Sequence, residues 1–285
     1  MFPAISLSAD FHRGNSQIHR DPRPTLLRRA LYVGVVRLVA IGDSTVEGLE
    51  DPRPDGTYRG WADRLAGHLA QQHPDLRYAN LAVRGRLARE VRTDQLPAAL
   101  DMRPDVAVVV AGVNDLLRPK LDGEALRDDL HAMHRSLRDT GATVLTFTMP
   151  DMARVAPLAV ALRPRLTLLN EITRESALLH GTTVVDLAAH DVASDPALWH
   201  DDRLHGNAEG HRRIGLALAE ALGCEVDDWR APLPEHPTKP LPRLVVDEVA
   251  WVASHLAPWA WRHLRGQSSG DERVCKRPEL LPLEH

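Results

Sequence analysis

Five short runs of consecutive apolar residues recur along the chain, each followed by a longer segment of mixed polarity. The first run ends at Ile41, and the others span residues 78–83, 106–111, 143–147 and 183–187. Runs of this length without polar alternation are typical of strands that are buried on both faces. Because a helix-length segment separates each run from the next, the pattern predicts βαβ units and a five-stranded parallel sheet.

The intervening segments carry apolar residues at helical spacing. In residues 60–72, Trp61, Leu65 and Leu69 recur at every fourth position, which places them on one face of a helix. Helices on both faces of a parallel sheet give a three-layer, doubly wound α/β fold. Further helices are predicted in the same way over residues 122–141, 164–181 and 208–222.

The polarity pattern divides the chain into four parts. Residues 1–30 are polar, rich in Arg and His and without periodicity, so we expect a flexible N-terminal extension. Residues 31–228 form the predicted core domain. A Pro-rich connection and a helical segment follow over residues 229–266, and residues 267–285 have the composition of a flexible, solvated tail.

The segment before this tail carries three tryptophans, Trp251, Trp259 and Trp261. It follows a stretch with five prolines in fourteen residues, which excludes a helix or a central strand there. Two roles are open for the Trp-bearing segment. It packs on the core or on a partner subunit, or it lines an acyl pocket or makes a weak membrane contact as an amphipathic element.

Charge and composition exclude several classes of function. The 285 residues include 35 Lys and Arg against 39 Asp and Glu, and this net charge of −4 is not the basic surface that nucleic-acid binding requires. Cys224 and Cys275 are too few and too far apart for a metal cluster or a disulfide framework. There is no signal-peptide pattern, and no apolar stretch approaches the about 20 residues that span a bilayer. We therefore expect a cytoplasmic protein without a transmembrane segment.

Polar residues follow the predicted strands directly, where ligands bind in an open parallel sheet. Gly-Asp-Ser, ending at Ser44, follows the first strand, Gly85 follows the second, and Asn114 follows the third. Asp202 and His205 stand three residues apart, ahead of the last predicted helix. We expect these groups to converge at one edge of the sheet.

These four blocks, Gly-Asp-Ser, Gly, Gly-x-Asn-Asp and Asp-x-x-His, resemble the sequence blocks of the SGNH, or GDSL, hydrolases in the same order. The resemblance covers residues 37–222. It implies a flavodoxin-like SGNH fold and an esterase or lipase that acts on a small-molecule or lipid ester. It also implies that no metal or cofactor takes part.

The resemblance implies a role for each residue. Ser44 is the nucleophile, His205 the general base and Asp202 the carboxylate that orients the imidazole. The backbone N–H groups of Ser44 and Gly85 and the side-chain amide of Asn114 form the oxyanion hole. The chemistry needs such groups, because a hydroxyl attacks a carbonyl poorly unless a base takes its proton, and because the tetrahedral oxyanion needs preorganised donors.

Simpler structural roles stay open for several of these residues. Ser44 at a helix start has the side chain of a common N-cap. Asp201 adjoins Asp202 and competes with it as the orienting carboxylate, although the spacing favours Asp202. The histidines at 131 and 134 are at helical spacing, and we interpret them, like His211, as residues of a solvated surface.

Two other functions remain as alternatives. One is a non-catalytic binding protein on the same scaffold, against which the complete set of motif residues argues. The other is Mg²⁺-dependent phosphoryl transfer to Asp43 at the end of the first strand, which requires a second carboxylate nearby. No acidic pair follows that strand in the sequence.

Overall fold

The five apolar runs form the parallel strands of one sheet. The computed structural model describes residues 35–234, 249–256, 270 and 273–283. The parallel strands lie in the order β5-β4-β3-β1-β2, so the predicted doubly wound sheet is confirmed, with its strand order reversing at β1. Their bounds are β1 Arg37–Gly42, β2 Arg77–Asn80, β3 Val106–Val110, β4 Thr143–Phe147 and β5 Thr183–Val185.

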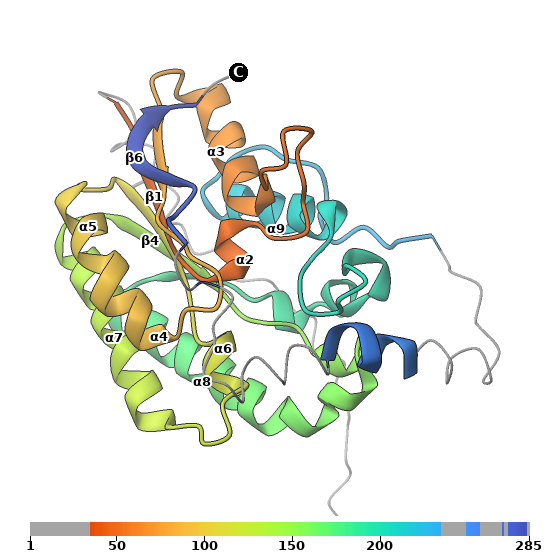
Figure 1. Cartoon of the computed structure of the whole chain (residues 1–285). Coiled ribbons are helices and arrows are strands. Elements are labelled where there is room, and N and C mark those ends of the chain that lie inside the picture. The colour runs from red at the N-terminus through yellow and green to blue at the C-terminus, as the bar shows by residue number, and fades with distance from the viewer. Residues whose placement is uncertain (1–34, 235–248, 257–269, 271–272, 284–285) are drawn as a thin grey trace, which may run out of the picture.

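Helices cover both faces of this sheet, which gives the predicted three layers (Figure 1). Helices α3 (Gly60–Gln72) and α9 (Ala208–Ala221) pack together on one face. Helices α5 (Leu96–Asp101), α7 (Gly123–Asp139) and α8 (Arg163–His180) lie on the other. The predicted stripe of Trp61, Leu65 and Leu69 is fully buried, so the apolar pattern reports the core-facing side of α3 correctly.

Short elements connect these layers. The single-turn helices are α2 Ser44–Glu47, α4 Ala88–Glu90 and α6 Val113–Leu116, and two π-helices are η1 Val91–Gln95 and η7 Val252–Leu256. The 3₁₀ turns are η2 Met152–Arg154, η3 Pro157–Leu162, η4 Leu187–Ala189, η5 Asp191–Ser194 and η6 Pro196–Leu198. The last three form the connection between β5 and α9.

A sixth strand corrects the prediction of five strands and of a flexible tail after residue 267. Strand β6 (Arg277–Pro282) pairs antiparallel with β2 at the sheet edge. Its two prolines and charged residues gave it the composition of a tail. An edge strand tolerates them, because one of its sides forms no ladder hydrogen bonds.

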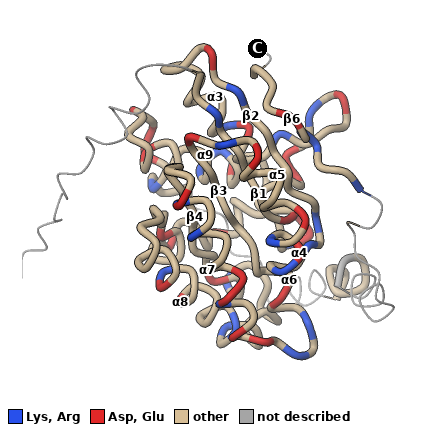
Figure 2. Tube along the Cα trace, turned by 90° about the vertical axis from the view of Figure 1, so that its left-hand side faces the viewer, with Lys and Arg blue, Asp and Glu red and all other residues tan. Residues whose placement is uncertain are grey.

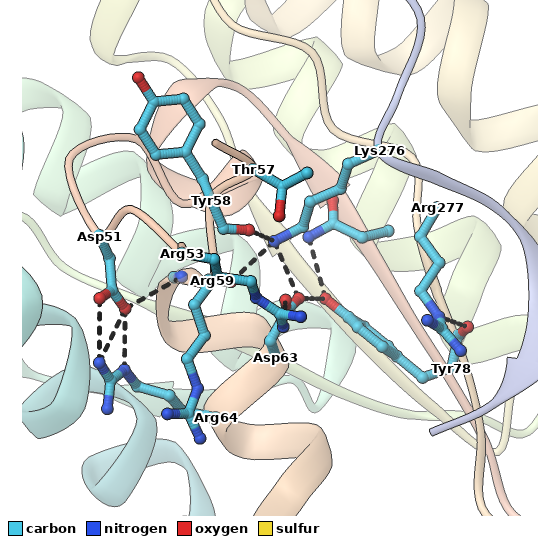
Figure 3. A network of polar contacts seen from close by, with 12 residues as sticks. Asp51, Arg53, Thr57, Tyr58, Arg59, Asp63, Arg64, Tyr78, Lys276 and Arg277 are labelled. Atoms are coloured by element: carbon cyan, nitrogen blue, oxygen red, sulfur yellow. Dashed lines mark hydrogen bonds and ion pairs between the residues drawn. The ribbon is translucent and has the colours of Figure 1, made fainter. Parts of the chain in front are cut away.

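Side chains from the same segment fasten β6 to the core (Figure 3). The Lys276 ammonium lies 2.8 Å from a carboxylate oxygen of Asp63 and donates to the carbonyl of Arg59 at 2.7 Å. The Tyr78 hydroxyl donates to the same Asp63 oxygen at 2.8 Å, and the Arg277 guanidinium donates to the Tyr78 carbonyl. Burial lowers the pKa of Lys276, although the charge of Asp63 opposes this effect. These contacts explain why residues 277–282 lie along β2.

Several predictions fall on residues that the structure does not describe. They are the extension over residues 1–30, most of the Pro-rich connection, and Trp259 and Trp261. Trp251 is described, and its side chain is 7% exposed. No helix among the described residues is long and apolar enough to cross a membrane. Basic and acidic residues are interspersed along the trace (Figure 2).

Candidate active site

Strand β1 and helix α2 present Ser44 at the carboxyl edge of the sheet. Asp43 is the N-cap of α2, and its carboxylate accepts the N–H of Thr45 at 3.0 Å. Ser44 is therefore the first helical residue, and the interpretation of Ser44 as the helix cap is wrong. The cap is supplied by its neighbour, which leaves the serine hydroxyl available for other contacts.

The hydroxyl of Ser44 lies against the imidazole of His205. Ser44 Oγ is 2.8 Å from His205 Nε2, and His205 Nδ1 is 2.6 Å from Asp202 Oδ2. Since a carboxylate only accepts, Nδ1 carries the proton and Nε2 accepts from the serine. The structure thus brings together three side chains that are up to 161 positions apart in the chain.

Asp202, rather than Asp201, is the carboxylate beside His205. Its second oxygen accepts the backbone N–H groups of Leu204 at 3.0 Å and of His205 at 3.1 Å. Burial raises the pKa of Asp202, but the hydrogen bond and charge of His205, together with these N–H groups, lower it to about 2. Asp202 therefore stays ionised at any pH near neutrality, whereas Asp201 is exposed.

Asp202 and His205 lie on a tight loop, residues 199–206, which we call the acid–base loop. An isolated bridge joins Trp199 to Gly206, and the His200 N–H donates to the His205 carbonyl at 2.9 Å. Arg203 has a φ of 57°, a left-handed conformation that is uncommon for a residue other than glycine. This reversal of the chain folds His205 back over the Asp202 carboxylate.

The two residues predicted for the oxyanion hole lie on neighbouring loops. Gly85 has a φ of 76°, in the region that glycine adopts without strain. Asn114 is in α6, and its Nδ2 donates to the Arg86 carbonyl at 3.0 Å and to Asp43 Oδ2 at 3.2 Å. The Asn114 amide thus bridges the loop of Gly85 and the residue before Ser44, and these contacts already engage the amide that is predicted to donate to an oxyanion.

Asp43 has the surroundings of a structural residue. Its side chain is 1% exposed, and its two oxygens face the Thr45 N–H and the Asn114 amide. Burial raises the pKa of Asp43 to about 6, while the Thr45 N–H and the charge of His205 oppose the rise. A phosphoryl acceptor must reach its donor, so this burial argues against the alternative of phosphoryl transfer to Asp43.

The end of β1 is held by Gln95, a residue that the sequence analysis did not select. The Gln95 side chain accepts the Gly42 N–H at 2.8 Å and donates to the Gly42 carbonyl at 2.9 Å. A Cβ at Gly42 would lie 2.2 Å from the Val110 carbonyl oxygen, so only glycine fits between β1 and β3. Gln95 ends the π-helix η1, an irregularity often found at functional sites.

An ion pair joins the helix of Ser44 to the loop of Gly85. Glu47 and Arg84 are both nearly buried, at 13% and 12% side-chain exposure. Arg84 donates to the Glu47 carboxylate through its backbone N–H at 2.8 Å and through its guanidinium. Ser44 stands three residues before Glu47, and Gly85 directly follows Arg84. The pair therefore fixes the two loops relative to one another.

His211 is buried, so its interpretation as a surface histidine is wrong. Its Nε2 donates to the Leu49 carbonyl at 2.8 Å, and its Nδ1 accepts the Trp61 N–H at 3.2 Å. Burial lowers the pKa of His211 to about 4, against the opposing effect of the Leu49 carbonyl. A neutral imidazole satisfies both contacts, and it ties α9, just after the acid–base loop, to the segment that follows Ser44.

The histidines at 131 and 134 lie between α7 and α8 rather than on a solvated face. His134 is fully buried, and its Nδ1 is 2.9 Å from the Ser176 hydroxyl. His131 Nδ1 is 3.4 Å from His180 Nε2. These side chains pack two helices together on the face of the sheet opposite α9.

Metal-ligating atoms gather at one place among the residues that the structure describes. Glu50, His200 and Asp202 each offer an atom within 4.8 Å of the others. Contacts within the protein already engage both nitrogens of His200, since Nδ1 accepts the Asp202 N–H at 3.3 Å and Nε2 lies 3.3 Å from a carboxylate oxygen of Glu50. We assign no metal to this group.

An apolar pocket with a volume of about 50 Å³ lies beside His205. Thr45 and His205 line it, so it adjoins the residues that follow and face Ser44. Most of the remaining lining is hydrophobic and comes from β4, α9 and the 3₁₀ turns after β5. It includes Phe147, Met149, Leu187, Leu198, Ile214 and Trp229.

One family model matches most of the chain that carries the site. The family model of the GDSL-like lipase/acylhydrolase family matches residues 40–213, which include Ser44, Gly85, Asn114, Asp202 and His205. No protein in the curated set that was compared matches the chain.

Solved structures show the same fold. An alpha/beta hydrolase enzyme from the metagenome of Lake Arreo, Spain, is 23% identical with a TM-score of 0.58, over 68% of this chain and 98% of that one. An acetylxylan esterase from Geobacillus stearothermophilus is 18% identical with a TM-score of 0.58, over 69% and 97%. A lipase/acylhydrolase from Enterococcus faecalis is 20% identical with a TM-score of 0.53, over 66% and 96%.

Proposed function

Since this chain belongs to the GDSL-like lipase/acylhydrolase family and is an ester hydrolase, we propose that it cleaves carboxylic esters without a metal, through an acyl-enzyme on Ser44. The observation that carries the proposal is the continuous contact from Ser44 Oγ to His205 at 2.8 Å and from His205 to Asp202 at 2.6 Å. In this arrangement His205 is the general base and Asp202 orients it.

Acylation follows from these contacts. As Ser44 Oγ attacks the ester carbonyl carbon, its proton passes to His205 Nε2, and the imidazolium is stabilised by the ionised Asp202. The tetrahedral intermediate then expels the alcohol, which takes the proton from Nε2. The acyl group remains on Ser44.

Deacylation repeats the same proton transfers with water. Water attacks the acyl carbon while His205 Nε2 accepts its proton, and collapse of the second intermediate returns that proton to Ser44 Oγ and releases the carboxylic acid. The backbone N–H groups of Ser44 and Gly85 and the Asn114 amide would stabilise each oxyanion. Asn114 then shares or exchanges its present contacts with Asp43 and Arg86 for the oxyanion.

The apolar pocket beside His205 supports short acyl groups as substrates. An apolar cavity of about 150 Å³ holds benzene, whereas this pocket has a volume of about 50 Å³. We therefore expect acyl chains of a few carbons to be hydrolysed fastest. This expectation concerns the acyl group alone and places no restriction on the alcohol part of the ester.

A direct test uses p-nitrophenyl esters of two to twelve carbons, with and without EDTA. The proposal expects turnover that is insensitive to EDTA and that declines as the acyl chain lengthens. Ser44→Ala should lower kcat by about 10⁴-fold or more, because both the nucleophile and the acyl-enzyme are lost. Ser136→Ala, on α7 and far from the site, is the matched control and should leave kcat unchanged.

Each other outcome overturns a part of the proposal. Turnover that persists in Ser44→Ala would contradict the assignment of the nucleophile. Loss of turnover in EDTA would contradict the metal-independent mechanism. A wild-type protein that hydrolyses none of these esters and is not labelled at Ser44 by an organophosphate would favour the non-catalytic binding protein.

A further inference from the structure

The acid–base loop is contacted by a residue from beyond the region that the family model matches. Trp251 lies 49 positions after Asp202, whereas the match ends at residue 213. Its side chain is 7% exposed, and its Nε1 donates to the backbone carbonyl of Asp202 at 3.0 Å. In Figure 1, the short helical segment that contains Trp251 lies beside the connection leading into α9.

Trp251 contacts the residues on both sides of one peptide bond. The Asp202 carbonyl, which accepts the indole N–H, belongs to the peptide that joins Asp202 to Arg203. The Arg203 guanidinium lies over the Trp251 ring, 4.9 Å from its centroid. One indole therefore restrains both the orientation of this peptide and the side chain that follows it.

This peptide sets the geometry of the acid. Arg203 is in the left-handed conformation, which strains a residue that has a Cβ, so contacts outside the turn must help to maintain it. On the N-terminal side of Asp202, the backbone N–H of this residue donates to His200 Nδ1 at 3.3 Å. With the N–H held by His200 and the carbonyl held by Trp251, the Asp202 backbone is fixed from both directions.

We propose that Trp251 is a positioning residue of the catalytic triad, which holds the Asp202–Arg203 peptide so that the Asp202 carboxylate faces His205. This inference rests on the proposed function of the triad. It makes the segment at residues 249–256 a part of the active-site architecture. The C-terminal residues also reach the other side of the site, since a Cβ at Gly270 would lie 2.0 Å from the Arg84 carbonyl oxygen, next to Gly85.

The test replaces Trp251 with phenylalanine, which keeps an aromatic ring beneath Arg203 and removes the N–H. Loss of one hydrogen bond that orients the acid should lower kcat by about 3- to 10-fold with KM unchanged. The rate at which diethyl p-nitrophenyl phosphate labels Ser44 should fall by the same factor, because labelling needs the same base. Val249→Ala, in the same segment and exposed, is the control and should match wild type.

A second substitution separates positioning from general destabilisation. Glycine adopts the left-handed conformation without strain, so Arg203→Gly should stabilise the turn by itself. Trp251→Phe should therefore lower kcat by a smaller factor in the Arg203→Gly background than in the wild-type background. Full additivity, or a Trp251→Phe variant with wild-type kcat and labelling rate, would overturn the inference. Those outcomes differ from failure of the proposed function, in which wild type itself neither turns over esters nor is labelled at Ser44.

Discussion

Ser44 lies directly after a strand of the central sheet, whereas Asp202 and His205 lie on a loop that no strand carries. The nucleophile half of the site, comprising Ser44, Gly85 and Asn114, is held by buried contacts at the strand ends. Gln95 bonds both polar backbone groups of Gly42, and Glu47 pairs with Arg84. The sheet itself therefore determines where the serine lies.

The acid–base loop is held by different means. Its internal hydrogen bonds and the left-handed Arg203 give it a shape, while His200 and Trp251 fix the backbone of Asp202. His211, on α9, joins the two halves through Leu49 and Trp61. The nucleophile half therefore depends on the core of the fold, whereas the acid–base loop depends on local turns and on a C-terminal residue.

After the loss expected for Ser44→Ala, the next largest effect comes from breaking the acid–base loop at Asp202. In Asp202→Asn the amide no longer stabilises an imidazolium, and its NH₂ group favours the wrong tautomer of His205. We expect kcat to fall by about 10³- to 10⁴-fold without a loss of folded protein. Asp201→Asn is the matched control, because it makes the same chemical change at the adjacent carboxylate, which is exposed. Equal losses in the two variants, measured with p-nitrophenyl acetate, would contradict the assignment of Asp202.

A smaller effect is expected in the nucleophile half, from Asn114→Ala. This substitution removes the proposed oxyanion donor and also the bridge between Asp43 and the Arg86 carbonyl. We expect kcat to fall by about 10²-fold, with KM changed little, because the donor acts mainly on the transition state. Steady-state kinetics measures kcat and KM separately. A kcat within threefold of wild type would show that Asn114 has only the bridging role.

The last effect concerns the connection between the halves and appears in stability rather than in rate. Native His211 has a pKa of about 4, below its ordinary value of 6.5, so the unfolded chain binds its proton more tightly. The contribution of neutral His211 to the free energy of unfolding is complete above pH 6.5. It falls by about 3 kcal/mol as the pH decreases toward 4.

Comparison with His211→Gln isolates this titration. Burial raises the pKa of Asp43 and of Asp115 to about 6. Protonation of these two carboxylates therefore increases the free energy of unfolding as the pH falls over nearly the same range. This increase masks the loss caused by His211 in the wild-type protein. Urea unfolding at pH 7 and pH 4 measures the free energy of unfolding of both proteins. The difference between wild type and His211→Gln should be smaller at pH 4 than at pH 7. A difference that stays constant with pH would contradict the burial of a neutral His211 in solution.

The parallel strands, the main helices and the residues that meet at the sheet edge were predictable from the sequence alone. Continuous apolar runs such as residues 106–110 can be buried only between two layers, and the stripe of Trp61, Leu65 and Leu69 defines one helix face. The spacing of Asp202 and His205 is local, so a single turn pairs them. These features depend on neighbours in the chain, which a sequence displays directly.

The contacts between residues distant in the chain became visible only in the folded protein. The polar, Pro-containing composition of residues 277–282 gave no sign of a strand, because the acceptors and partners of β6 lie about 200 positions earlier on Tyr78, Arg59 and Asp63. Likewise, nothing near Gln95, His211 or Trp251 in the chain reveals that each bonds the backbone of another segment. Such roles depend on which backbone groups the folded core leaves to be satisfied, and local periodicity carries no information about that.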